Sequence, residues 1–149
     1  MKIMRRLTFI LACLLTLCAT IACADNEKPI AVSQLPANAQ QFITQHFAGR
    51  KVALAKVENE IVSKSYEVMF ADGSHVDFDG KGNWTEVDCR QTGVPAAVIP
   101  AQIMDYVKAN YPDVTVMKIE RDRREYEVKL SNRIELKFDK KFRLIDIDM

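Results

Sequence analysis

The sequence has few of the residues that most enzymes use for catalysis. Its 149 residues include two histidines, His46 and His75, and one cysteine beyond residue 24, Cys89. It has no metalloprotease, redox-dithiol, serine-hydrolase or phosphate-loop motif. A single cysteine cannot form an internal disulfide, so Cys89 is either a reactive or intermolecular thiol or, as we favour, a small buried residue. Cys89 and His75 are the only candidate nucleophile and base, and we expect no enzyme.

The sequence also lacks a strong excess of charge of either sign. The net charge is +1, and removing residues 1–24 takes away three basic and no acidic residues, which leaves −2. Neither half of the chain has the large basic patch that nucleic-acid binding requires. Acidic pairs on an open strand have no apolar surroundings to raise a carboxyl pKa, which argues against glycoside hydrolysis. We therefore expect no nucleic-acid partner.

The first 24 residues have the pattern of a secretory signal. Basic residues precede an apolar run from Leu7 to Ala22, and Ala22-Cys23-Ala24 is a suitable cleavage site. The run is shorter than the ~20 residues of a membrane-spanning helix. Lipid anchoring through Cys23 is the alternative. The expected product is a periplasmic domain of residues 25–149, which contacts the membrane only if Cys23 is acylated.

The remaining chain is organised as two similar halves. Residues 66–88, YEVMFADGSHVDFDGKGNWTEVD, align without a gap with residues 126–148, YEVKLSNRIELKFDKKFRLIDID. Such a repeat must be recognised before a fold is assigned. Each half begins with an amphipathic helix of three to four turns that starts near a proline. We predict one domain with repeats at about 32–89 and 96–149.

After each helix, apolar and polar residues alternate, which predicts four strands in each half. Such alternation is typical of an antiparallel sheet with one packed face and one hydrated face. The sequence therefore predicts an α+β fold, in which two tandem helix-plus-four-strand repeats form one antiparallel sheet of about eight strands with two helices on one face. The side chains expected on the packed face are Tyr66, Val68, Phe70, Val76, Phe78, Val87, Tyr126, Val128, Leu130, Ile134, Leu136, Phe138, Ile145 and Ile147.

One hairpin carries an acidic string that could bind a metal ion. Asp77, Asp79 and Asn83, with Glu86 or Asp88 across the hairpin, could supply the oxygen ligands that calcium prefers. The string lacks the residue order of an EF-hand, and the second copy has lysines in its place. A glycine-containing turn with solvated carboxylates is the simpler interpretation. Calcium therefore stays an alternative ligand.

A second candidate site is the hydrated face of the sheet. The alternation places Trp84 on this face, and its counterpart in the second copy is Leu144. Together with Met69 and His75, they would form an exposed apolar and aromatic surface that could bind a protein. The alternative is that Trp84 covers the end of the hairpin or contacts the linker between the halves.

The motifs of this chain resemble those of a known family. L-P at a helix start, K-V-E, Y-E-V and F-D, with I-P and K-I-E as the counterparts of the first two in the second half, stand behind a signal peptide and are similar to the motifs of the PepSY-like periplasmic proteins. The resemblance covers about Val32 to Asp148 and implies a fold like that of the β-lactamase inhibitor protein. It also implies a non-enzymatic, exported and inhibitor-like module that binds a periplasmic protein or peptide through its sheet. A calcium- or small-ligand-binding sensor is the alternative, because some relatives are described as calcium-regulated.

Overall fold

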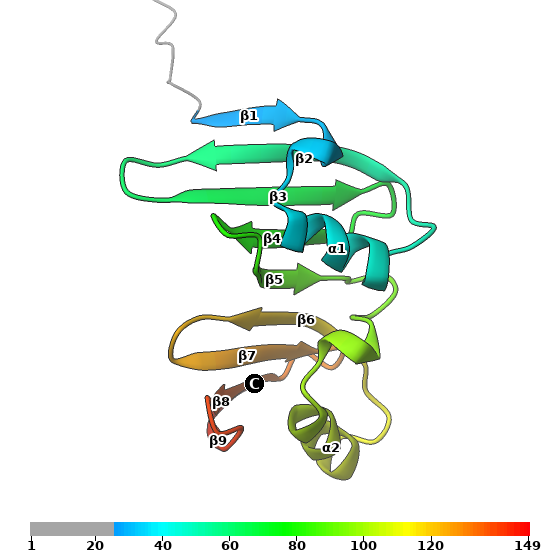
Figure 1. The fold of residues 1–149 in the computed structure, drawn as a ribbon. Helices are drawn as coiled ribbons and strands as arrows, with labels where there is room; N and C mark the ends of the chain where they lie inside the picture. The colour runs from blue at the N-terminus through cyan, green and yellow to red at the C-terminus, as the bar shows by residue number, and fades with distance from the viewer. Residues whose placement is uncertain (1–25) are drawn as a thin grey trace, which may run out of the picture.

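The described chain folds into one antiparallel sheet of nine strands, whose spatial order follows the sequence (Figure 1). The computed structural model describes residues 26–149, so the predicted signal segment and Cys23 lie outside the described residues. The strands are β1 (Glu27–Ile30), β2 (Val52–Asn59), β3 (Lys64–Phe70), β4 (His75–Asp79), β5 (Trp84–Asp88), β6 (Val116–Arg121), β7 (Glu125–Leu130), β8 (Glu135–Asp139) and β9 (Leu144–Asp148). The helices are α1 (Ala37–His46) and α2 (Ala101–Asn110), each preceded by a short 3-10 turn, η1 (Val32–Gln34) and η2 (Ala96–Val98).

The α+β class is confirmed, but the sheet has nine strands where the sequence predicts about eight. The additional strand is β1, which pairs with β2 at one edge of the sheet. Its sequence is EKPI, and Pro29 has no backbone N–H to donate to a neighbouring strand. Proline is tolerated at a sheet edge, where one side of the strand has no partner. A four-residue polar strand with a proline gives no alternation signal, and residues 25–32 therefore look like a polar lead.

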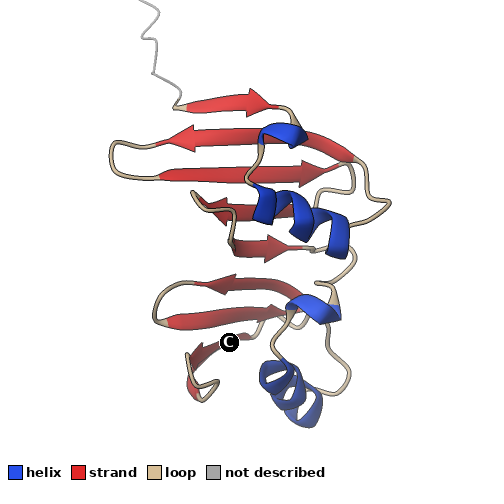
Figure 2. Ribbon diagram, in the orientation of Figure 1, coloured by secondary structure: helices blue, strands red, loops and turns tan. Residues whose placement is uncertain are grey.

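Both helices pack on the same apolar face of the sheet (Figure 2). The α1 residue Phe42 meets Phe78 of β4 edge-on, with ring centroids 5.7 Å apart. The α2 residue Tyr106 meets Phe138 of β8 in the same way, at 5.4 Å. Each helix has ten residues, slightly under three turns, and begins directly after a proline. The expected core is confirmed in β3, β4, β7 and β8, where apolar side chains facing the helices are buried or half-buried.

A bulge in the β4–β5 pair overturns the expected position of Trp84. Asp77 pairs with Glu86, but the next residue, Phe78, pairs with Trp84, so Thr85 is an extra residue in β5. A bulge of one residue reverses the side-chain alternation beyond it. Trp84 therefore lies on the helix side of the sheet, only 8% exposed, with its ring 6.3 Å from Phe42.

The same irregularity recurs in the second half and moves Leu144. Lys137 pairs with Asp146, whereas Phe138 pairs with Leu144, which packs against the core. The expected burial of Ile145 and Ile147 is wrong, since they are 54% and 41% exposed. They belong to β9, the last strand of the sheet, which has a neighbour on one side only. An edge strand is buried less than a central one, even where its pattern matches that of β5.

The buried position expected for Cys89 is confirmed. Cys89 directly follows β5 and is fully buried, and this burial raises the pKa of its thiol. A thiol of this kind is rarely ionised at neutral pH and reacts slowly. Within residues 26–149, neither helix has the length and apolar character that crossing a membrane requires.

Candidate functional site

The hydrated face of the sheet, which we call the open face, carries a row of acidic side chains. Cross-strand pairing connects Glu67 with Asp77, Asp77 with Glu86, Glu86 with Glu120, and Glu120 with Glu127. These five residues, the acidic row, come from five neighbouring strands, β3 to β7. Like charges directly opposite one another on a sheet are destabilising. The acidic row is therefore a costly arrangement that strand formation does not require.

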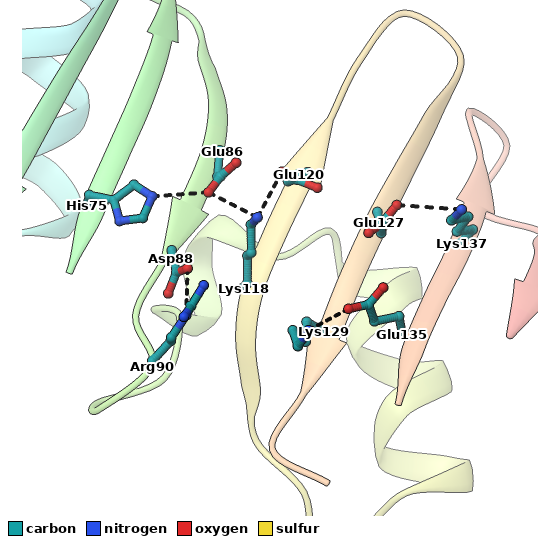
Figure 3. A network of polar contacts seen from close by, with 10 residues as sticks. All are labelled: His75, Glu86, Asp88, Arg90, Lys118, Glu120, Glu127, Lys129, Glu135 and Lys137. Atoms are coloured by element: carbon teal, nitrogen blue, oxygen red, sulfur yellow. Dashed lines mark hydrogen bonds and ion pairs between the residues drawn. The ribbon is translucent and has the colours of Figure 1, made fainter. Parts of the chain in front are cut away.

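Lysines neutralise parts of the acidic row. Lys118 Nζ lies 3.1 Å from Glu86 Oε1 and 2.9 Å from Glu120 Oε1, as Figure 3 shows. Lys56 Nζ lies 2.6 Å from Glu67 Oε2 at one end of the row. Lys137 Nζ lies 3.8 Å from Glu127 Oε2 at the other end. These contacts leave Asp77, which lies between Glu67 and Glu86, without a lysine partner among the described residues.

Asp77 is the least satisfied member of the row. Its Oδ1 atom is buried and has no hydrogen-bond partner within residues 26–149. Burial, followed by the charges of Glu86 and Glu67, raises the pKa of Asp77 from 3.8 to about 6. A buried acceptor without a donor costs free energy that a bound cation or N–H group would recover. Asp77 is therefore the position in the row with the most to gain from a ligand.

His75 connects the acidic row to a second line of charges. Its Nε2 atom lies 3.1 Å from Glu86 Oε1, and this contact raises the pKa of His75 (Figure 3). The same contact lowers the pKa of Glu86, with Glu120 and Lys118 acting in the same direction. Asp88 pairs with His75 across the strands and bonds to Arg90 Nε at 3.0 Å. The face therefore contains groups that titrate near neutral pH beside groups that stay charged.

A hollow of about 300 Å³ opens beside the acidic row. Its lining combines residues of β4, β5, β6 and β7 with the hairpin that joins β6 to β7. Within this hairpin, Asp122 Oδ1 accepts hydrogen bonds from the backbone N–H groups of Arg124 and Glu125. The lining contains six carboxylates, one guanidinium and one hydroxyl: Asp77, Thr85, Glu86, Glu120, Arg121, Asp122, Glu125 and Glu127. The hollow is suited to a positively charged group.

The structure separates the five residues predicted to bind a metal. Asp79 Oδ1 accepts hydrogen bonds from the backbone N–H groups of Lys81 and Asn83, both at 2.9 Å, and so closes the β4–β5 turn. Asn83 Nδ2 donates to Asp79 Oδ2 at 3.1 Å. Asp77, Glu86 and Asp88 lie together on the open face around His75. Two triads have potential ligand atoms within 4.8 Å of one another: Glu67, His75 and Asp77, and His75, Glu86 and Asp88.

Only two of the four residues predicted for protein binding lie on the open face. Met69 and His75 are paired there, and Met69 is 37% exposed. Trp84 and Leu144 lie on the helix side, because of the bulges described above. Among the described residues, the four therefore do not form the expected apolar and aromatic surface; exposed Met69 pairs with exposed Leu54, and the acidic row with its lysines lies beside them.

Sequence reasoning misses most of the acidic row. The alternation places Glu67 and Glu127 on the hydrated face, but not next to the other acids. Strand register makes the row, since Glu86 and Glu120 come from different halves and meet where β5 pairs with β6. The signal that could have revealed the row is that successive strands each carry an acid at positions that become cross-strand partners.

A protein family and several solved structures are related to this chain. The family model described as "Putative beta-lactamase-inhibitor-like, PepSY-like" matches residues 64–146. A structure from Bacteroides thetaiotaomicron, described as a "putative calcium-regulated periplasmic protein", is 64% identical with a TM-score of 0.83 and aligns over 85% of this chain and 99% of its own. No curated protein is similar enough to this chain to add to these matches.

Two further structures, both from Bacteroides vulgatus, have the same fold. One, described as a "putative periplasmic protein from DUF2874 family", is 55% identical with a TM-score of 0.82 over 85% of this chain and 99% of its own. The other, described as a "putative periplasmic protein of unknown function", is 38% identical with a TM-score of 0.78 over 83% and 99%. These relatives are all described as periplasmic proteins.

Proposed function

This chain belongs to the PepSY-like family, and we propose that it is a non-enzymatic periplasmic module whose open face binds a basic segment of another protein or peptide. The observation that carries the proposal is the acidic row across β3 to β7, with the hollow beside it. Side chains that break the local rules of sheet stability concentrate at functional positions. A cationic partner turns this unfavourable row into a favourable contact.

The dimensions of the acidic row suit an extended segment better than a single side chain. Neighbouring strands lie about 4.8 Å apart, so the row from Glu67 to Glu127 extends over about 19 Å. Side chains on one side of an extended peptide repeat about every 7 Å. A segment lying across the strands can therefore place two or three lysine or arginine side chains along the row. Arginine suits such a surface because its planar guanidinium binds carboxylates in a bidentate manner.

The direct test is binding of a fluorescently labelled hexalysine peptide, with hexaglutamate as the opposite probe. We expect hexalysine to bind and to weaken steeply as salt rises, and hexaglutamate not to bind. The variant Glu86→Gln/Glu120→Gln should bind hexalysine at least about tenfold more weakly. Its matched control is Asp113→Asn/Glu60→Gln, which removes two exposed carboxylates elsewhere in the chain. Equal weakening in both variants would mean that only net charge matters, and would overturn the assignment to the open face.

Calcium binding is the second candidate function, and the unpaired Oδ1 of Asp77 is the observation that favours it. Calcium takes several oxygen ligands, and Glu67 and Asp77 offer carboxylate oxygens close to one another. His75 completes both triads but supplies nitrogen, which is a better ligand for zinc than for calcium. A calcium ion would therefore use Asp77 with its acidic neighbours. The relative described as calcium-regulated supports this candidate.

Calorimetric titration with calcium, magnesium and zinc chloride separates the alternatives. We expect a calcium dissociation constant in the range of extracellular modules, about 10⁻⁴–10⁻³ M, that is lost in Asp77→Asn. Asp79→Asn should retain binding, because Asp79 already closes a turn. If zinc binds in a manner that requires His75 and calcium does not bind, the metal of this site is zinc and the calcium proposal is wrong. Calcium that displaces hexalysine would show that both ligands use the same carboxylates.

A further inference from the structure

A second concave surface lies on the helix side of the sheet, and it shares Arg121 with the hollow beside the acidic row. This groove, of about 600 Å³, runs between the start of α2 and the neighbouring strands β5 and β6. Its floor includes Trp84 of β5 and Arg121 of β6. One wall is formed by residues 96–101, and α2 contributes Met104, Asp105 and Lys108. A volume of this size is within the range of small-molecule sites.

Arg121 is the unusual residue of the groove. Glu120 points to the open face and Ile119 to the core, so the strand alternation returns Arg121 to the helix side. Its guanidinium carbon lies 3.9 Å from the centre of the Trp84 ring, and its Nε donates to the Trp84 carbonyl oxygen at 2.8 Å. The stack and the hydrogen bond fix the plane of the guanidinium against the indole.

Arg121 has hydrogen-bonding capacity left for a ligand. None of the ion pairs within residues 26–149 includes it. The bond to the Trp84 carbonyl uses one of five N–H donors. Burial lowers the pKa of Arg121, while the nearby Tyr126 and Asp79 favour its charged form. A half-buried cation without a carboxylate partner is stabilised by a bound anion.

Apolar residue types make up much of the rest of the lining, and the surface they share with polar atoms is mixed. The lining includes Ala96, Ala97, Val98, Ile99, Pro100 and Met104. Lys108 adds a second cation, and Asp105 is the only carboxylate among the lining residues. The first residues of α2 also contribute, and the first turn of this helix has no acidic side chain. The charges therefore favour an anion, and the apolar side chains among the lining residues favour a short hydrocarbon body beside it.

We propose that this groove binds a small amphipathic carboxylate, with its carboxylate on Arg121 and its hydrocarbon chain along Trp84 and the η2–α2 segment. The charge of Arg121 selects a carboxylate over an amine or an alcohol. The small exposed part of Trp84 and the apolar residues of the wall contact the chain, since apolar burial contributes about 0.8 kcal/mol for each methylene. This site takes an anion and the acidic row takes a cation, so binding of octanoate and binding of hexalysine test the two proposals independently, although Arg121 borders both hollows.

The single tryptophan of the chain is Trp84, so its fluorescence reports directly on the groove. The probes are octanoate, octylammonium and 1-octanol, all below the concentrations at which they aggregate. We expect octanoate to change the Trp84 emission in a saturable manner, and the other two to bind at least about tenfold more weakly. Equal binding of the three, or no saturable change and no heat with octanoate, would overturn the proposal.

Two pairs of variants identify the groups responsible. Arg121→Gln should weaken octanoate binding at least tenfold, whereas Arg121→Lys should retain part of it. Because Arg121 also supports Trp84, a second pair leaves it in place. Ala97 is an exposed lining residue, so Ala97→Glu should repel octanoate while Ala97→Gln, of the same size, should not.

Further controls separate the charge of the groove from its shape. If Ala97→Gln weakens binding as much as Ala97→Glu, the charge argument is wrong. The open-face variant Glu86→Gln/Glu120→Gln should leave octanoate binding unchanged. The peptide acetyl-Leu-Leu-Leu has a free C-terminal carboxylate. If it binds more tightly than octanoate, the ligand of the groove is the C-terminus of a peptide and the proposal of a small carboxylate is wrong.

Discussion

Replacing Asp77 with asparagine should stabilise the protein at neutral pH, which is unusual for a substitution in the middle of a sheet. Asp77 lies between Glu67 and Glu86, and its Oδ1 atom has no partner among the described residues. Asparagine has nearly the same shape but no charge. Its Nδ2 can donate to a neighbouring carboxylate, as the protonated form of Asp77 can. Asp77→Asn therefore imitates the protonated state that the surroundings favour.

The size of the effect follows from the pKa of Asp77. Burial, with Glu86 and Glu67, raises it from 3.8 to about 6, and a shift of about two units corresponds to about 3 kcal/mol. The carboxyl is only partly buried, so solvent screening reduces the effect to about 1–2 kcal/mol. Because the folded pKa is the higher one, ionisation costs more in the folded protein. The penalty begins above the unfolded pKa, near pH 4, and is complete above pH 6.

Urea unfolding followed by Trp84 fluorescence measures this prediction. At pH 7.5 Asp77→Asn should raise the unfolding free energy by about 1–2 kcal/mol, and at pH 4 it should have almost no effect. Asp79→Asn is the matched control, two residues away on the same strand. Hydrogen bonds from Asn83 and Lys81 outweigh burial and lower the pKa of Asp79, so this variant should destabilise at pH 7.5. Loss of stability in Asp77→Asn by the same amount at both pH values would refute the reasoning.

Three further outcomes are expected. Gly82→Ala should lower the unfolding free energy by about 2 kcal/mol or more, because φ is +83° and a Cβ would lie 2.7 Å from Pro36 Cβ. Gly49→Ala is the control, since φ is +78° but nothing lies within 4 Å of the added Cβ, and it should cost about half as much. Equal costs of the two variants in urea unfolding would mean that the protein relieves the contact with Pro36. Phe78→Ala should cost about 3–5 kcal/mol in the same assay, since Phe78 is fully buried against Phe42, and a cost below about 1 kcal/mol would contradict this packing. The thiol of Cys89 in the chain without residues 1–24 should react with a thiol reagent at the rate of unfolding, whereas rapid reaction of the native protein would show that it is accessible.

The sequence predicts the packed side of this fold well because that side is determined by local patterns. Alternation in β3, β4, β7 and β8 places their apolar residues correctly against the helices. Pro36 and Pro100 mark the starts of α1 and α2. These signals are contained within about ten residues of chain, so no information about distant strands is needed. The edge strand β1 escapes notice because Pro29 and two charged residues give it no such pattern.

The open face is predicted poorly because it depends on pairing between strands. Trp84 and Leu144 change sides through one extra residue in β5 and in β9, and nothing in the local sequence of either hairpin requires a bulge there. Glu86 and Glu120 are 34 positions apart and become neighbours only when the two halves join. The side chains of a hydrated sheet face are polar at every second position, and this pattern does not indicate which of them become neighbours. The charges that matter there can be grouped only after the register is known.

The second half of the chain shows that this fold does not need the carboxylate of Asp77. The gap-free alignment of the halves places Lys137 at the position of Asp77, and Glu127 at the position of Glu67. Lys137 lies 3.8 Å from Glu127 and balances its charge. The same pair in the first half consists of two acids, Glu67 and Asp77, with a third acid, Glu86, on the other side. Because the same strand position accepts a lysine that relieves the repulsion, sheet stability does not explain the acid. The cationic ligand proposed for the open face would explain it, since only the first arrangement leaves an acid, Asp77, without a lysine partner among the described residues.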